Sequence, residues 1–253
     1  MFKKLILLLI ILSVVACKTQ QWQVNQASST RIAIDASTQV LADTSYMNYL
    51  QPFKSQVDNS MNIVIGKAAQ TMRGHAPESL LSNFSADVYR KAASDYMKTE
   101  VDIAIVNLGG LRTVVPEGDI MVRKIFELMP FENELVVLYL KGDKLNELCQ
   151  YFASMGGEGI SGLRMVIANK KAIDITINGA PLDLNKTYTV ATNDYLAGGN
   201  DKMIALASYT KRVNTSIKVR TILLNYIKAE TAAGRPINSQ LDGRITIQNE
   251  SEL

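Results

Sequence analysis

Histidine is almost missing from this chain, because His75 is the only one among 253 residues. A site that holds two metal ions, or that activates a serine or cysteine nucleophile, usually draws on several histidines or on a histidine base. The sequence also offers no Asp-x-His pair, no Walker loop and no Ser-His-Asp set. His75 itself is interpreted as a loop residue rather than a ligand. These absences argue against hydrolysis carried out by this chain's own residues.

Cysteine is nearly as scarce, with Cys17 and Cys149 alone. Cys149 lies in "KLNELCQYFASM", on the apolar stripe of a predicted helix, which predicts a small core residue. A catalytic thiol would need a histidine close to it in space. Because only His75 is available, Cys149 is not interpreted as a nucleophile.

Residues 1–17 are predicted to be a lipoprotein signal peptide. A short basic start precedes an apolar run over residues 5–15, and "AC" closes the segment at Cys17. The run has about half the length of a membrane-spanning helix, and a small residue directly before a cysteine resembles a lipobox. Lipidation of Cys17 would anchor the protein in the bacterial cell envelope, at the periplasmic face or the outer membrane, and would leave Cys149 without a disulfide partner. The alternative is an ordinary cleavable signal in which Cys17 has no role.

The chain has no strong excess of charge of one sign, because its 27 Lys and Arg residues nearly balance its 24 Asp and Glu residues. There is no long basic block and no basic-aromatic strip, so we expect no nucleic-acid partner. No second apolar stretch is long enough to span a membrane. Residues 18–30 are polar and aperiodic and are interpreted as a tether, and residues 31–253 as one soluble domain held by the lipid anchor.

The patterning within residues 31–253 predicts an α+β fold. Apolar residues at helical spacing alternate with strand-like runs, yet several predicted strands follow one another directly. That mixture favours a mixed β-sheet with packed helices over a strict βαβ repeat. One predicted helix begins at Asp43, with a kink or late start at Pro52, and the other predicted helices lie within residues 77–99, 119–131, 142–155 and 215–234. The predicted strands lie within residues 30–37, 61–68, 101–106, 134–142, 163–193 and 243–248. The stretch "SMGGEGISG", residues 154–162, is predicted to form a flexible loop and lid.

The stretch "VDIAIVNLGGLRTVVPEGDI" contains the first candidate site. An apolar run stops at Asn107, and Gly109, Gly110 and Arg112 follow. Glycines let a backbone turn tightly and let a ligand come close to it. The guanidinium of Arg112 is a planar fork suited to carboxylate or phosphate, and the amide of Asn107 both donates and accepts. Taken alone, the pattern also fits a strand-end turn with a surface arginine.

Two further loops place an aromatic residue next to the end of a strand. Phe131 follows Pro130 in a polar turn, where it would form a stacking platform for a base or tuck into the core as a corner residue. Tyr195 follows the run "TYTVAT", and Asp201 comes after it in a turn of small residues. By itself this last loop is generic.

In this order the three loops resemble the C-terminal domain of bacterial and animal 5'-nucleotidases. That family has Asn-x-Gly-Gly-(Ile/Leu)-Arg, then a Pro-Phe turn before a strand, then a loop of the type Asn-(Phe/Tyr)-x-Ala-x-Gly-Gly-Asp-Gly. The chain has "NLGGLR", "LMPFENELVVLYLKGDKL" and "NDYLAGGNDK", and "PESLLSNFSADVY" and "LDGRI" extend the likeness over about residues 45–248. The resemblance implies a 5'-nucleotidase C-terminal domain-like fold that binds the nucleoside end of a nucleotide.

The resemblance also implies roles for individual residues. Phe131 and Tyr195 would form the two faces of a clamp around the base, and Asp201 would accept the ribose hydroxyls. Arg112 and Asn107 would help to hold the phosphate or ribose side, where Arg112 would orient the ligand and neutralise charge. The residues expected to bind substrate are Asn107, Gly109, Gly110, Arg112, Phe131, Tyr195 and Asp201.

The chain departs from the family pattern at several positions. Asn200 and Lys202 replace two glycines of the third loop, which would restrict its backbone and add a cation nearby. Ser82 stands where the family usually has glycine. A second arginine of some members falls near His75, and Arg73 is adjacent but out of register, so the chain has no arginine in register for the second cationic contact.

A complete 5'-nucleotidase adds a metallophosphoesterase half that holds two metal ions and activates a water. With one histidine, this chain is expected to carry no metal site, and divalent metals are expected on a separately encoded metallophosphatase chain that acts with it. The alternative is an envelope lipoprotein that captures nucleosides or nucleotides without turnover. A third reading is that the altered third loop has lost its ligand and the domain serves only as a docking surface.

Overall fold

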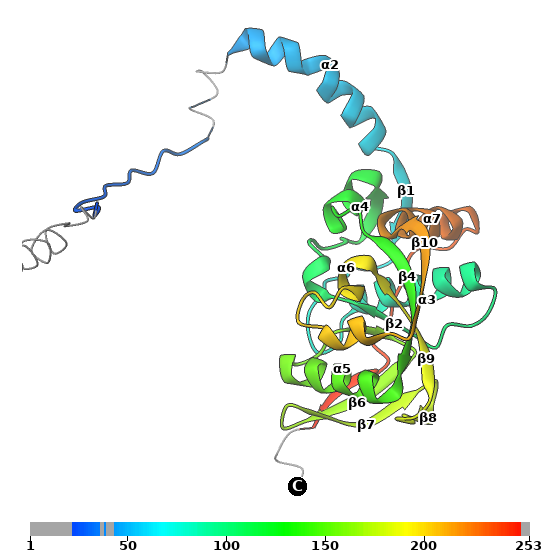
Figure 1. The fold of residues 1–253 in the computed structure, drawn as a ribbon. Coiled ribbons are helices and arrows are strands. Elements are labelled where there is room, and N and C mark those ends of the chain that lie inside the picture. The colour runs from blue at the N-terminus through cyan, green and yellow to red at the C-terminus, as the bar shows by residue number, and fades with distance from the viewer. Residues whose placement is uncertain (1–21, 36–37, 39–42, 249–253) are drawn as a thin grey trace, which may run out of the picture. The chain divides into compact units, whose positions relative to one another are not determined.

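The computed structural model describes residues 22–35, 38 and 43–248 (Figure 1). The predicted signal peptide and the lipidation of Cys17 lie outside these residues. Pro52–Leu253 forms one compact unit. None of the helices in the described part of the chain is both long and apolar enough to cross a membrane.

The segment before this unit contains one wrong prediction. Residues 30–35, the described part of the strand predicted at 30–37, take no strand conformation. Ile32 and Ile34 are exposed there, so their side chains do not pack against a core in the way that stabilises a strand. Helix α2 (Thr44–Met61) begins after Asp43, whose carboxylate accepts the backbone N–H of Ser45 at 2.9 Å, as predicted for a cap. The helix continues through Pro52, so it has no late start.

A five-stranded sheet forms the centre of the compact unit, and strand β2 (Ile103–Val106), buried at every position, lies inside it. A continuous apolar run of this kind is typical of a strand covered on both faces. The strand order is β10-β4-β9-β2-β5, with β2 and β9 parallel and the other neighbouring pairs antiparallel. The remaining strands are β4 (Glu134–Lys141), β5 (Gly159–Ser161), β9 (Thr187–Asn193) and β10 (Lys211–Lys218).

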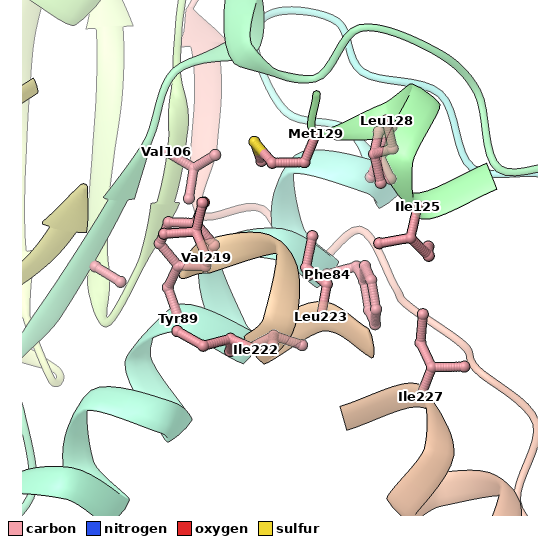
Figure 2. Packing of buried hydrophobic residues seen from close by; sticks show 14 of the residues in the cluster. Phe84, Tyr89, Val106, Ile125, Leu128, Met129, Val219, Ile222, Leu223 and Ile227 are labelled. Carbon is pink, nitrogen blue, oxygen red and sulfur yellow. The ribbon is translucent and has the colours of Figure 1, made fainter. Parts of the chain in front are cut away.

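Both faces of this sheet carry a hydrophobic cluster. Ala104 and Val106 of β2 point into one cluster with α3 (Leu80–Met97), α4 (Val122–Leu128) and α7 (Val219–Ala232), parts of which Figure 2 shows. Ile103 and Ile105 point into the other, with α5 (Gly142–Met155). Alternate residues of one strand therefore serve two cores.

Two smaller sheets complete the fold and confirm the α+β prediction. One contains β11 (Ile245–Gln248), β6 (Leu163–Ala168), β7 (Lys171–Ile177) and β8 (Ala180–Pro181), in that order, with β11 and β6 parallel. The other is the antiparallel pair β1 (Val64–Ala68) and β3 (Gly118–Met121). The short helix predicted within residues 119–131 is α4, preceded by β3, and the last predicted helix is shorter than expected, because residues 215–218 belong to β10.

The departure from the family pattern at Ser82 has a local explanation at the start of α3. Ser79 caps the helix, and Ser82 completes a capping box by accepting the backbone N–H of Ser79 at 3.2 Å. Asn83 is buried and donates to Glu78 at 2.6 Å and to the carbonyl of Gln240 at 2.8 Å. The motif "PESLLSN" therefore ties the start of α3 to the end of the chain.

The lid predicted at residues 154–162 is wrong. Residues 159–161 are strand β5, which is buried and pairs with β2. Gly157 has a φ of 132°, and a Cβ there would collide with the backbone of Pro77. In this segment, glycine at position 157 therefore allows two backbone segments to approach closely and does not indicate free movement of a lid.

Candidate functional site

Sheet topology brings the three candidate loops to one edge. Because β2 and β9 are parallel neighbours, Asn107 and Asn193 leave the sheet on the same side. Strand β4 runs antiparallel to β9, with Leu135 opposite Asn193, so the turn that carries Phe131 enters the sheet at that edge. Loops separated by many residues in the sequence thus meet where these strands end or begin.

The three loops enclose a pocket of about 360 Å³. Every residue that the sequence predicts to bind substrate lies in its lining. Three further lining residues were missed, although each is close in sequence to a predicted one. The pocket is lined by Asn107, Gly109, Gly110, Arg112, Phe131, Tyr195 and Asp201, together with Met129, Asn133 and Asn193.

The Gly-Gly corner is built around the side chain of Asn107. This amide is 8% exposed and donates from Nδ2 to Oδ2 of Asp201 at 2.6 Å, which links the first loop to the third. A Cβ on Gly110 would come within 2.6 Å of Oδ1 of Asn107, so the corner requires glycine at that position. A Cβ on Gly109 would lie 3.9 Å from Nδ2 of Asn107 and would not collide with it, and Gly109 lines the pocket.

Arg112 lies exposed at the mouth of the corner. Its Nη1 donates to the carbonyl of Gly109 at 3.1 Å, and its backbone N–H donates to the carbonyl of Leu128 at 3.0 Å. Within the described residues no carboxylate forms an ion pair with Arg112, whereas Arg90, Arg123, Arg164, Arg220, Arg235 and Arg244 all have one. The guanidinium is therefore held near the pocket with its charge available to an anion.

Phe131 and Tyr195 present aromatic surface to the pocket. Each is 42% exposed, which rules out the interpretation of Phe131 as a corner residue tucked into the core. The hydroxyl of Tyr195 donates to Oδ1 of Asp201 at 2.8 Å, and this hydrogen bond raises the pKa of the phenol. Both carboxylate oxygens of Asp201 therefore already accept hydrogen bonds, one from Tyr195 and one from Asn107.

The third loop accommodates its two departures from the family pattern. Asp201 and Lys202 have φ angles of 53° and 62°, a left-handed conformation that favours glycine and is strained at Lys202. Asn200 donates from Nδ2 to the carbonyl of Tyr195 at 2.7 Å, so its side chain closes the loop onto the helical turn α6 (Asp194–Ala197). The loop keeps Asp201 directed at the pocket without the usual glycines.

Glu158 supports the Gly-Gly corner from outside the pocket lining, and the sequence analysis missed it. Its carboxylate accepts the N–H of Leu108 at 2.5 Å and that of Gly159 at 3.2 Å, from behind the Gly-Gly corner. Burial raises the pKa of Glu158 to about 7, and the charge of Asp201 adds to this rise, although the two backbone N–H groups oppose it. Its position in a glycine-rich segment gave no local signal of this role.

Other polar candidates lie elsewhere. His75 is an exposed loop residue, as predicted, and neither it nor Arg73 lines the pocket. Cys149 is a buried core residue, as predicted, and burial raises the pKa of its thiol to about 12. Across the described ranges, no group of three or more His, Cys, Asp or Glu side chains is placed to hold a metal ion.

Comparison with known proteins gives one consistent family. The family model described as "5'-nucleotidase, C-terminal domain" matches residues 64–208. Protein UshA of Yersinia enterocolitica is 25% identical over 214 residues, which cover 81% of this chain and 38% of that protein. A 5'-nucleotidase of Vibrio cholerae is 23% identical over 202 residues, covering 78% of this chain and 36% of that protein. The chain therefore spans less than two fifths of the length of these relatives.

Solved structures agree with the sequence comparisons. The 5'-nucleotidase precursor from Thermus thermophilus superposes with a TM-score of 0.69 at 28% identity, over 81% of this chain and 43% of that one. The NAD nucleotidase of Haemophilus influenzae gives a TM-score of 0.60 at 20% identity, over 81% and 41% of the two chains, and supports the fold.

Proposed function

Because the chain belongs to the family of 5'-nucleotidase C-terminal domains, as its motifs predict, we propose that its pocket binds the nucleoside end of a nucleotide. The observation that carries this proposal is the convergence of three distant loops on one pocket with two half-exposed aromatic rings and an arginine without a carboxylate partner among the described residues. The relatives' names support a nucleotide as the ligand.

Each part of the pocket suits a part of such a ligand. The rings of Phe131 and Tyr195 are suited to stack on a base, because every base has an apolar face. Asp201 is suited to accept the ribose hydroxyls, and Arg112 to pair with a phosphate in the bidentate manner of a guanidinium. The role of Arg112 is orientation and charge neutralisation rather than proton transfer.

The hydrolytic chemistry is assigned to another chain. We propose that a separately encoded metallophosphatase supplies the metal ions and the activated water, and that this domain places the phosphate over them, which is catalysis through positioning. The alternative is a lipoprotein that binds nucleosides or nucleotides without turnover. A neighbouring gene for a phosphatase that lacks this domain would favour the first over the second. Lipidation of Cys17 would hold either form at the cell envelope.

The aromatic clamp is tested by binding. We expect AMP and adenosine to bind the purified protein without added metal, and Phe131→Ala and Tyr195→Ala each to weaken binding by about 5- to 150-fold, the range of base-on-aromatic stacking. Isothermal titration calorimetry measures both. The matched control is Tyr96→Ala, because Tyr96 is 43% exposed and lies on α3 outside the pocket. Failure of the folded wild-type protein to bind either ligand would overturn the proposal and favour a docking surface.

The hydrogen bond from Tyr195 to Asp201 leads to a second prediction. Tyr195→Phe keeps the ring but removes the hydroxyl that occupies Oδ1 of Asp201. A ribose hydroxyl then no longer has to displace it, so we expect adenosine to bind about 3- to 10-fold more tightly, in line with one net hydrogen bond. The affinity for 2',3'-dideoxyadenosine should stay unchanged in the same titrations. An equal change for both nucleosides would remove Asp201 from the ribose site.

A further inference from the structure

The start of α7 contacts the turn that carries Phe131 through several hydrogen bonds. The backbone N–H of Val219 donates to the carbonyl of Asn133 at 2.9 Å, and Nζ of Lys218 donates to the carbonyl of Glu132 at 2.8 Å. Arg220, the second residue of α7, donates from Nη1 to the carbonyls of Met129 at 3.2 Å and Phe131 at 3.3 Å. These three consecutive residues thus bind four carbonyls of the turn.

Arg220 makes the largest share of these contacts. It is 9% exposed, its guanidinium lies 4.1 Å from the centre of the Phe126 ring, and its Nη2 forms an ion pair with Glu132. The helix that carries it is anchored in the core, since Val219 and Leu223 are fully buried in the cluster that includes Met129 (Figure 2). Arg220 itself does not line the pocket. Two of the carbonyls that it binds, those of Met129 and Phe131, belong to residues that do.

We propose that Arg220 is a positioning residue that fixes the ring of Phe131 in the orientation a nucleobase requires. The inference rests on the proposed function and extends it to a residue 89 positions away in the sequence. The turn has no ladder hydrogen bonds of its own, because β4 begins only at Glu134. Without Arg220, the carbonyls of Met129 and Phe131 lose these donors, and the ring has to be ordered when the ligand binds. That ordering cost appears as lost affinity.

The geometry requires a guanidinium. One planar group reaches two carbonyls, a carboxylate and a ring face together, whereas an ammonium group is a single point with three donors. Arg220→Lys should therefore restore only part of the affinity that Arg220→Gln removes. Glu132→Gln is the mildest variant, since it loses the ion pair but leaves both carbonyl contacts, and the Glu132 side chain is 66% exposed.

A double-mutant cycle separates positioning from a general structural role. On the full chain purified in detergent, we expect Arg220→Gln to weaken AMP binding about tenfold, the equivalent of about one net hydrogen bond. In a Phe131→Ala background the same change should cost nothing further, because the ring that it positions is gone. In a Tyr195→Ala background it should still cost its full factor. Equal losses in all three backgrounds would overturn the proposal.

A second measurement needs no ligand and so remains decisive if AMP does not bind. Trp22 is the only tryptophan of the chain, so Trp22→Phe with Phe131→Trp places a single reporter on the turn. Adding Arg220→Gln or Glu132→Gln should lower its fluorescence anisotropy and raise its quenching by acrylamide, with the larger effect for Arg220→Gln. A reporter at Tyr195→Trp should not respond. If the anisotropy and the quenching of the tryptophan at position 131 do not change, the positioning role of Arg220 is overturned. If the wild-type protein does not bind AMP, only the proposed function is overturned.

Discussion

Replacing Arg244 with methionine is expected to lower the free energy of unfolding by about 3 kcal/mol. This is the low end of the range for breaking a buried ion pair from one side, because the side chains of Asp87 and Asp242 are 50% and 40% exposed. The Arg244 side chain is 9% exposed and donates to Asp87 at 2.8 Å, to Asp242 at 3.0 Å and to the carbonyl of Ile160 at 2.8 Å. Glu78, 8% exposed, lies 4.0 Å from its Nε. Methionine fills similar space but leaves these acceptors without their cation.

Urea unfolding at pH 7 measures this loss. The matched control is Arg164→Met, because Arg164 also pairs with Asp242, at 3.4 Å, but its side chain is 51% exposed. A solvated pair of that kind contributes about 0–1 kcal/mol. If both variants lose the same amount, the Arg244 cluster is not a buried network. A large loss confined to Arg244→Met would establish that this cluster joins β11 to the start of α3.

Glu158→Gln is expected to abolish a pH dependence of stability in the wild-type protein. The folded state holds the Glu158 proton up to a pKa of about 7, whereas the unfolded chain releases it near 4.5. Between these values the folded state binds more protons at Glu158, so the contribution of this group to stability is greatest below pH 4.5 and falls as pH rises to 7. At 1.36 kcal/mol for each unit, this contribution reaches about 3 kcal/mol.

Urea unfolding at pH 5 and pH 8 tests this expectation. Glu158→Gln keeps an oxygen that can accept from Leu108 but carries no charge, so it should exceed the wild-type stability by about 3 kcal/mol at pH 8 and by much less at pH 5. Glu147→Gln is the control, since Glu147 is 54% exposed on α5 and a surface change there should stay within about 0.5 kcal/mol. A constant gap between Glu158→Gln and wild type at both pH values would show that burial does not govern this carboxylate.

The pocket lining was largely predictable because its residues belong to short local patterns. Gly109, Gly110 and Arg112 follow a buried strand, and a ligand-binding corner needs that order of residue types within a few positions. Phe131 and Tyr195 likewise occur in polar turns that a propensity for strand or helix does not explain. The prediction of a lid at residues 154–162 was wrong because the local pattern there is ambiguous. A glycine-rich stretch indicates an unusual backbone, but it does not distinguish free movement from a close approach to Pro77.

Glu158 and Arg220 required the tertiary structure. Glu158 accepts from Leu108, 50 positions away, and Arg220 donates to Phe131, 89 positions away, and neither Glu158 nor Arg220 has a local signature. The α+β class, the family and most residues of the pocket lining could be predicted from the sequence alone, because these depend on periodicity and on residue types at short spacing. The packing of distant segments determines which charges are buried and which side chain holds which turn. Only the tertiary structure shows this packing, since desolvation and hydrogen bonding depend on neighbours in space.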